Sequence, residues 1–217
     1  VMYATGRSPN THGLGLEEAG IALDEVGAIK VDEFSKTAVD HIYAIGDVTE
    51  RLNLTPVALA EAEAFANTVY RDSPTAMDYA NVASAVFSQP PIGSVGWTED
   101  QAREKADIDV YVYRLTPMKY TLYGRDEKKM MKIIVDRETG TVLGCHMVGL
   151  DAPEIIQGIA IALKCGATKD QFDANERKRF FSTDGLHCCA NVAGGAIARP
   201  SHAKELFASP ELLRAVV

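Results

Sequence analysis

The sequence predicts an α+β fold with a mainly antiparallel sheet, and three features of its 217 residues support this. Short apolar runs separated by turn residues recur from the first residue to the middle of the chain. Two such runs, residues 130–135 and 142–148, flank the polar segment 136–140, as in a β-hairpin. Residues 151–164 place isoleucine and leucine at helical spacing, which predicts an amphipathic helix that covers the sheet.

The first seventy residues alternate short apolar runs with turns and then form a helix. Each run is short enough for a strand and is followed by Gly or Asp. A helix is expected to begin at Thr55, with Thr55 as the N-cap and Pro56 in the first helical position, and to end near Tyr70. The three runs expected to be strands are residues 1–4, 28–31 and 41–45.

After a linker at residues 71–74, the second segment has the pattern of the sheet domain. Further strands are expected around a turn that contains two consecutive prolines, and Thr98 is expected to cap a short polar helix. Gly166 is expected to stop the amphipathic helix. This gives about two helices in the second segment. The additional strands are residues 83–87, 94–97 and 110–115.

Composition excludes several classes of function. The chain has 22 Lys and Arg against 30 Asp and Glu, a net charge of −8, which argues against binding to nucleic acid or to an anionic membrane surface. It contains no apolar run long enough to span a bilayer and no secretory signal. Four cysteines without a C-x-x-C pair predict no disulfide scaffold and no zinc site. A reducing compartment, the cytosol or an organellar matrix, is therefore expected, and a cytoplasmic location is the prediction.

The strongest local chemical motif is the apolar run 42–45 followed by Gly46 and Asp47. Glycine permits close approach of another group, and an ionised carboxylate only accepts hydrogen bonds, which suits a polyhydroxylated ligand. An Asp that merely caps a turn is an equally weighted alternative. The helix that starts at Leu54-Thr55-Pro56 presents free N–H groups and a positive dipole end, which favour an anionic ligand atom. Together the two features could bind one ligand that has both groups.

Nine blocks of the sequence carry a resemblance to one enzyme family. Through them the chain resembles the C-terminal part of the flavoprotein disulfide reductases, and within that family the glutathione reductases most closely. The likeness runs from Val1 to about Ala174. A removed or missing N-terminal part is expected, because the chain begins at Val1 rather than Met. The blocks are residues 4–10, 13–17, 42–49, 53–59, 87–93, 95–99, 144–149, 154–158 and 162–168.

The resemblance implies part of an FAD site. Asp47, after Gly46, is similar to the family's Asp that hydrogen-bonds the ribityl chain of FAD. Leu54-Thr55-Pro56 resembles the helix start that faces the pyrimidine edge of the isoalloxazine, where reduced flavin is anionic. Thr5-Gly6 resembles the turn at which the NADPH domain returns to the FAD domain.

The resemblance also implies the domain organisation. Residues 1–73 correspond to the C-terminal end of an FAD-binding α/β domain in the NADPH- and FAD-binding region. Residues 81–174 correspond to an α+β dimerisation domain with an antiparallel sheet, through which family members form homodimers. Residues 175–217 are an unmatched tail.

Several parts of the family's machinery are absent from the sequence. It contains no G-x-G-x-x-G nucleotide turn, no C-x-x-x-x-C redox pair and no His-Pro motif after Phe172-Asp173. No catalytic residue and no metal ligand are therefore assigned. The sequence predicts a fragment of an NADPH-dependent glutathione-disulfide reductase, inactive alone, whose FAD, NADPH and glutathione disulfide belong to the parent enzyme.

Two alternatives to this function remain open. The first is a dimerisation module that binds no flavin, because the strands expected at residues 1–4 and 28–31 would lack most of their neighbours. The second resembles mercuric reductase, which carries a vicinal cysteine pair near its C-terminus, and would use Cys188 and Cys189.

Several other features are expected to have structural or surface roles rather than functional ones. Cys145 and Cys165 are expected to be packed or inert thiols, and His146 is expected to be structural. Residues 176–179 are expected to be a solvated charge run, and residues 180–181 apolar surface. The segment 117–123, with Tyr120 and Tyr123, is expected to pack on the dimer face.

Overall fold

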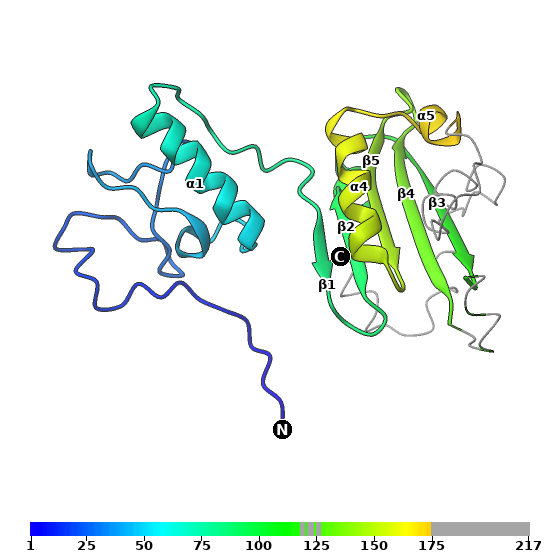
Figure 1. Ribbon diagram of the computed structural model, residues 1–217, viewed down its shortest axis with the longest axis horizontal. Helices are drawn as coiled ribbons and strands as arrows, with labels where there is room; N and C mark the ends of the chain where they lie inside the picture. Colours follow the sequence, from blue (N-terminus) through cyan, green and yellow to red (C-terminus); the bar gives the residue numbers. More distant parts are fainter. Residues whose placement is uncertain (118–119, 121–123, 125–126, 175–217) are drawn as a thin grey trace. The chain divides into compact units, whose positions relative to one another are not determined.

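The chain forms two compact units, residues Val1–Tyr79 and Ala80–Val217, which we call the N-terminal and C-terminal units. The computed structural model describes residues 1–117, 120, 124 and 127–174 (Figure 1). None of the helices in these residues is both long and apolar enough to cross a membrane. The elements are η1 (Gly46–Thr49), α1 (Thr55–Tyr70), β1 (Ser84–Val86), β2 (Ile92–Gly96), α2 (Glu99–Lys105), β3 (Ile108–Leu115), β4 (Lys129–Asp136), β5 (Val142–Val148), α4 (Ala152–Lys164) and α5 (Lys169–Ala174).

The C-terminal unit is built on a five-stranded antiparallel sheet in the order β1-β2-β5-β4-β3, as the sequence predicts. Cys145 on β5 lies opposite Val95 on β2 and Ile133 on β4, so these three side chains share one face. All three are at most 2% exposed. Successive side chains of a strand alternate between faces, which explains how one sheet buries two separate clusters.

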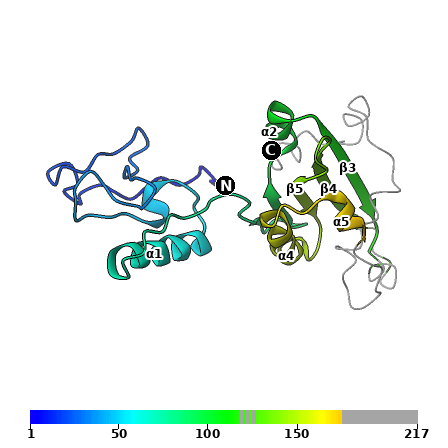
Figure 2. The same ribbon diagram turned by 90° about the horizontal axis from the view of Figure 1, so that it is seen from above.

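Helices cover both faces of this sheet. Ile156 and Ile159 of α4 and Phe172 of α5 pack on the face that carries Ile133. In Figure 2, α4 and α5 lie on one side of the strands and α2 on the other. Ala102 of α2 is fully buried in the second cluster. This central packing is the main hydrophobic contribution to the stability of the unit.

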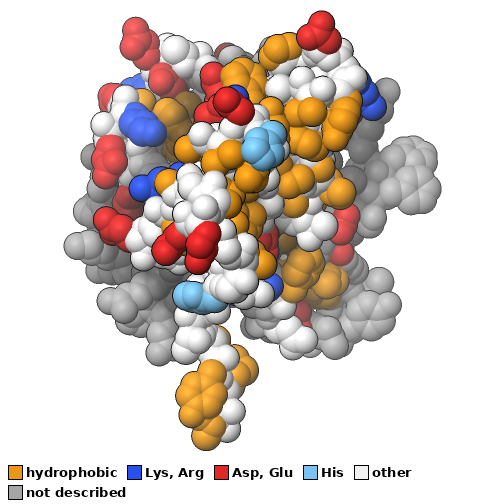
Figure 3. Space-filling model, turned by 90° about the vertical axis from the view of Figure 1, so that its left-hand side faces the viewer, with side chains coloured by type: hydrophobic (Ala, Val, Ile, Leu, Met, Phe, Trp, Pro, Cys, Tyr) orange, Lys and Arg blue, Asp and Glu red, His pale blue; other side chains and the backbone are white. Residues whose placement is uncertain are grey.

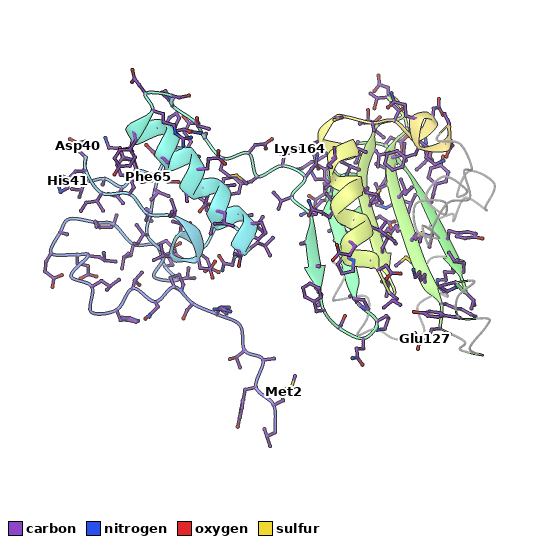
Figure 4. The ribbon with its side chains drawn as sticks, viewed as in Figure 1. Met2, Asp40, His41, Phe65, Glu127 and Lys164 are labelled. Atoms are coloured by element: carbon purple, nitrogen blue, oxygen red, sulfur yellow. The ribbon has the colours of Figure 1, made fainter. Side chains whose placement is uncertain are left out.

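Local capping sets the helix ends that the sequence predicts. Thr98 accepts a hydrogen bond from Gln101 N at 3.3 Å and its own N–H donates to Gln101 Oε1 at 3.1 Å, a capping box. Gly166, with φ +67°, ends α4 through a hydrogen bond to Leu163 O. Lys164, labelled in Figure 4, donates to the carbonyl of Ala80 at 2.6 Å and so ties the end of α4 to the chain before β1.

The N-terminal unit contains α1 and a small core, and the three predicted strands are wrong. Residues 1–4 are exposed and form no strand, and the other two runs contribute only single bridges, Leu23 to Ile29 and Lys36 to Tyr43. Side-chain hydrogen bonds form loops on both sides of the run 28–31. Asp24 Oδ1 accepts from two backbone N–H groups within four residues, and Asp32 Oδ1 does the same.

One further expectation for the C-terminal unit needs correction, because about two helices were expected and the described residues contain a third, the short helix α5. Cys165, expected to be packed or inert, is exposed, so the packed alternative does not hold for it. Cys145 is buried, and Tyr120 is 6% exposed. Tyr123, residues 176–179, residues 180–181 and the pair Cys188-Cys189 lie outside the described residues.

Candidate functional site

The turn at Gly46-Asp47 is held rigidly against α1. Gly46 has φ +75°, a conformation that side chains disfavour, and a Cβ added there would lie 3.4 Å from Ala58 Cβ. Thr49 Oγ1 donates to Gly46 O at 2.8 Å, and Val48 O accepts from Ile29 N at 2.9 Å. The glycine therefore serves both the turn and the close approach to the helix.

Asp47 lies in the first turn of η1 with its side chain exposed to solvent. Ile45, not Asp47, is the N-cap of η1, and no side chain caps it. The alternative of a turn-capping Asp is therefore wrong. Within the described residues, the Asp47 carboxylate has no hydrogen-bond partner, so its acceptor oxygens face outward. Such a carboxylate on a rigid turn is suited to accept a hydrogen bond from a hydroxyl group of a ligand.

The start of α1 differs by one residue from the expectation. Leu54, in an extended conformation, is the N-cap, and Thr55 is the first helical residue, so Thr55 is not the N-cap. Val57 N and Ala58 N both donate to Leu54 O, and Pro56 has no N–H. No side chain caps the helix and its first turn contains no acidic residue. The positive end of the helix dipole is thus uncompensated next to the exposed Thr55 and Pro56.

A buried carboxylate that the sequence analysis missed, Glu61, binds the backbone of the turn at Gly46. Glu61 of α1 is 2% exposed, and its Oε2 accepts from Gly46 N at 2.6 Å. Its Oε1 accepts from the Tyr79 hydroxyl. Burial, and next the hydrogen bond to Glu61, raise the pKa of Tyr79. The signal that could have revealed Glu61 was a charged residue on the apolar, alanine-rich face of the helix. A Glu buried there requires hydrogen-bond partners.

The tyrosine hydroxyl is in turn held by Arg51. Arg51 Nη1 donates to Tyr79 Oη at 2.8 Å, and Nη2 donates to the carbonyl of Asp32. The guanidinium carbon lies 5.6 Å from the centre of the Tyr79 ring, within the range of a cation–π contact. Three residues far apart in sequence therefore form one chain of contacts that ends on the backbone of Gly46.

A contact between two aromatic rings holds the apolar run before Gly46 against α1 at a second point. Phe65 of α1 points toward the loop that bears Asp40 and His41 (Figure 4). Its ring meets that of Tyr43 edge to face at 5.0 Å between centroids. The strand-like run before Gly46 is thereby fixed to α1 at two points, Tyr43 and Gly46.

The last predicted pair does not join this arrangement. Thr5 and Gly6 lie in an exposed segment, with Gly6 at φ +93°. Among the described residues they make no hydrogen bond to η1 or α1. The structure therefore brings together Gly46, Asp47 and α1, and leaves Thr5 and Gly6 apart from them.

His146 is the most buried histidine that the structure describes, at 2% exposure, and it links two strands. Its Nε2 lies 3.0 Å from Trp97 O, and because a carbonyl only accepts, Nε2 carries the proton. Nδ1 then accepts from the Ser94 hydroxyl at 2.5 Å. Burial lowers the pKa of His146. Both nitrogens are satisfied inside the sheet, a structural arrangement rather than a site open to substrate.

The residues at η1 and α1 fit part of a flavin site. A hydroxyl-rich chain is matched by the unpartnered carboxylate of Asp47, and an anionic ring edge by the uncapped start of α1. In the part of the chain that the structure describes, no three His, Cys, Asp or Glu residues gather in a way that could hold a metal ion.

Family profiles match both units. Residues 82–176 match the dimerisation domain of the pyridine nucleotide-disulphide oxidoreductases, and residues 1–62 match a second profile described as pyridine nucleotide-disulphide oxidoreductase. The two profiles belong to the same group of enzymes and follow each other in the order of the units.

Individual relatives give the same result. The chain is 55% identical over 175 residues to the chloroplastic/mitochondrial glutathione reductase of Pisum sativum, covering 80% of this chain and 32% of the relative. It is 54% identical to the glutathione reductase of Burkholderia cepacia, over 80% of this chain and 39% of the relative. Trypanothione reductase of Trypanosoma congolense is 42% identical over 93% of this chain and 40% of its own length. That alignment extends past Ala174, where the sequence analysis expected the likeness to end.

Among solved structures, the HOCl-induced flavoprotein disulfide reductase RclA of Escherichia coli matches with a TM-score of 0.77 and 31% identity. The match covers 85% of this chain and 43% of that one. The chain thus spans between about a third and two fifths of the curated relatives' lengths. With matching profiles in both units, the predicted sheet and relatives at 55% identity, the chain belongs to the pyridine nucleotide-disulphide oxidoreductases and corresponds to a C-terminal part of them.

Proposed function

We propose that this chain is the part of a glutathione-reductase-like enzyme that contributes one wall of the FAD site and the dimerisation domain. The observation that supports this most is the exposed, unpartnered Asp47 on a rigid turn beside an uncapped helix start. The 55% identity to a glutathione reductase makes glutathione disulfide the proposed substrate and NADPH the proposed reductant of the whole enzyme. The match to a dimerisation domain supports a homodimer.

In this proposal the flavin, when bound, accepts hydride from NADPH and passes the electrons to a disulfide. The residues of this chain bind and orient. Asp47 accepts a hydrogen bond from a ribityl hydroxyl, and the start of α1 stabilises negative charge on the pyrimidine edge. Thr5 and Gly6 remain a prediction as residues near the nucleotide-binding domain. The 217-residue chain is proposed to be inactive alone, because its sequence contains neither a redox cysteine pair nor a nucleotide turn.

A chimaera tests the proposal. The 175 aligned residues of this chain replace the equivalent segment of the Pisum sativum relative, whose own residues are kept before and after it. We expect the purified chimaera to retain flavin, to sediment as a dimer and to oxidise NADPH with glutathione disulfide. Asp47→Ala should lose flavin, whereas Asp40→Ala, an exposed carboxylate of the same unit, should keep it. A folded chimaera without flavin, or equal flavin content in both variants, would refute the FAD assignment.

The second candidate is a dimerisation module that binds no flavin. The structure of the N-terminal unit is the observation in its favour: its expected strands are absent, and its hydrophobic cluster of buried residues contains only Ile21, Ile29 and Ala44 among the described residues. Apolar side chains are uncovered on the face shown in Figure 3, and the exposed side chains of this unit include Leu14 and Leu59. A chimaera that dimerises without flavin would favour this function. Cytoplasmic location, and a mercuric-reductase-like role for Cys188-Cys189, stay predictions.

A further inference from the structure

Glu61 is a buried carboxylate on α1, within a unit whose other buried polar side chains, among the described residues, are the hydroxyl-bearing Thr11, Ser35, Thr37 and Thr49. The residue is 2% exposed, next to Val57 at 2% and Ala64 at 8% on the same helix face. Removing an ionised carboxylate from water costs free energy unless hydrogen bonds compensate it. The compensation here is complete, because both oxygens are occupied: Oε2 by Gly46 N at 2.6 Å and Oε1 by the Tyr79 hydroxyl.

The contact with Gly46 is the one that bears on the site. Gly46 immediately precedes Asp47, and its N–H is the first amide of η1. A hydrogen bond between a backbone N–H and a carboxylate is charge-assisted and shorter than a neutral one, as the 2.6 Å distance illustrates. Glu61 therefore fixes the direction in which the chain leaves the run before Gly46, and with it the direction of the Asp47 side chain.

Arg51 and Tyr79 hold Glu61 from the other side. The Tyr79 hydroxyl donates to Glu61 and accepts from Arg51 Nη1 at 2.8 Å, so a single hydroxyl is used in both directions. The other guanidinium nitrogen reaches the backbone carbonyls of Val31 and Asp32.

We propose that Glu61, held by Tyr79 and Arg51, is a positioning residue for flavin: it binds the Gly46 amide and so aims Asp47 at the ribityl chain. This inference rests on the proposed function, and adds to it a residue that touches no flavin. It distinguishes Glu61 from Glu63, an exposed carboxylate two residues along the same helix.

The first test uses the 217-residue chain without flavin. The amide proton of Gly46 is followed by NMR in the wild type and in Glu61→Leu, Glu61→Gln and Glu63→Leu. We expect Glu61→Leu to speed hydrogen exchange at Gly46 about tenfold or more, because the charge-assisted bond is lost. Glu61→Gln keeps an acceptor oxygen, so it should retain most of the protection while the amide resonance moves upfield. Glu63→Leu should change neither.

The second test places the same variants in the chimaera and measures FAD dissociation. We expect Glu61→Leu to weaken FAD binding about tenfold or more, Glu61→Gln to restore most of it, and Glu63→Leu to have no effect. If Glu61→Leu does not fold, Tyr79→Phe is used instead. It should speed hydrogen exchange at Gly46 and weaken FAD binding to a smaller extent. The circular dichroism of each variant checks that α1 is intact.

The outcomes separate this inference from the proposed function. An unchanged rate of hydrogen exchange at Gly46 in Glu61→Leu would overturn the inference, whatever the effect on FAD binding. Faster exchange with unchanged FAD binding would also overturn it, provided that Asp47→Ala still loses flavin. If Asp47→Ala keeps its flavin as well, the proposed function is what fails, and the inference fails with it.

Discussion

Protonation of His146 should make the C-terminal unit less stable in mild acid. The folded protein holds this ring neutral: burial lowers its pKa, nearby Lys132 lowers it further, and the hydrogen bond to Trp97 O and the charge of Glu99 oppose this. The unfolded chain binds the proton near the ordinary value of 6.5, and the folded protein binds it only at a lower pH. Between these two values the unfolded state binds more protons, so the free energy of unfolding falls as the pH falls.

The size of the effect has an upper bound. A single proton changes the free energy of unfolding by at most about 1.4 kcal/mol for each pH unit between the two pKa values. The stabilisation is fully present above 6.5 and declines below it. Glu99 titrates in a lower range: burial raises its pKa, but the hydrogen bonds and positive charges of Lys132 and Arg103 together lower the pKa overall. Protonation of His146, rather than of Glu99, therefore sets how the free energy of unfolding changes with pH in mild acid.

The assay compares the wild type with His146→Gln, which cannot take up a proton. Urea unfolding is followed by fluorescence, and Trp97, the one tryptophan of the sequence, lies in the C-terminal unit beside His146. We expect the wild type to lose stability between about pH 7.5 and about pH 5.5 more steeply than the variant. Only the slopes are compared, so that a packing defect in the variant cancels. Equal slopes, or a shallower slope for the wild type, would refute the reasoning.

Three further predictions concern the fold and use the same assay. Gly93→Ala should destabilise by about 1–3 kcal/mol, because its Cβ would lie 2.6 Å from Ala152 O and 2.8 Å from Ile156 Cγ1; wild-type stability would contradict the close approach of β2 to α4. Ile133→Ala, at a fully buried position, should cost about 2–5 kcal/mol; a loss under about 1 kcal/mol would be inconsistent with that burial. Thr98→Ala should cost about 1 kcal/mol by removing the cap of α2, and no loss would mean that the capping box contributes nothing.

The C-terminal unit could be predicted because short-range rules determine most of it. The hairpin of β4 and β5 follows from alternation around a polar turn, and α4 from apolar residues at helical spacing. The helix α5 was missed although it begins with the same type of motif as α2. Thr168 and Gln171 exchange hydrogen bonds at 2.9 and 3.3 Å, as Thr98 and Gln101 do. Six residues are too few to show periodicity, so the capping motif was the only indication.

The N-terminal unit could be predicted less well because its short runs depend on partners. A run of four apolar residues becomes a strand only where another strand supplies hydrogen bonds, and the residues described here supply single bridges. The helix α1 was predicted to within one residue of its observed start and at its observed end, since an alanine-rich segment after Pro56 forms a helix with little tertiary help. Its N-cap was predicted wrongly as Thr55, because Leu54 acts through backbone conformation alone.

The candidate site shows most clearly what a linear pattern can and cannot reveal. Gly46 and Asp47 were identifiable, because glycine followed by a carboxylate after an apolar run is a local pattern. Glu61 was not, because its burial depends on Gly46, fifteen residues before it, and on Tyr79, eighteen residues after it. The proposed ligand-facing group, Asp47, could therefore be suggested by adjacent residues, whereas Glu61, the residue proposed to aim it, is defined only by tertiary contacts. Variants of Asp47 and of Glu61 should then differ in kind: the first removes an acceptor from a rigid turn, and the second leaves the acceptor on a turn that is no longer held.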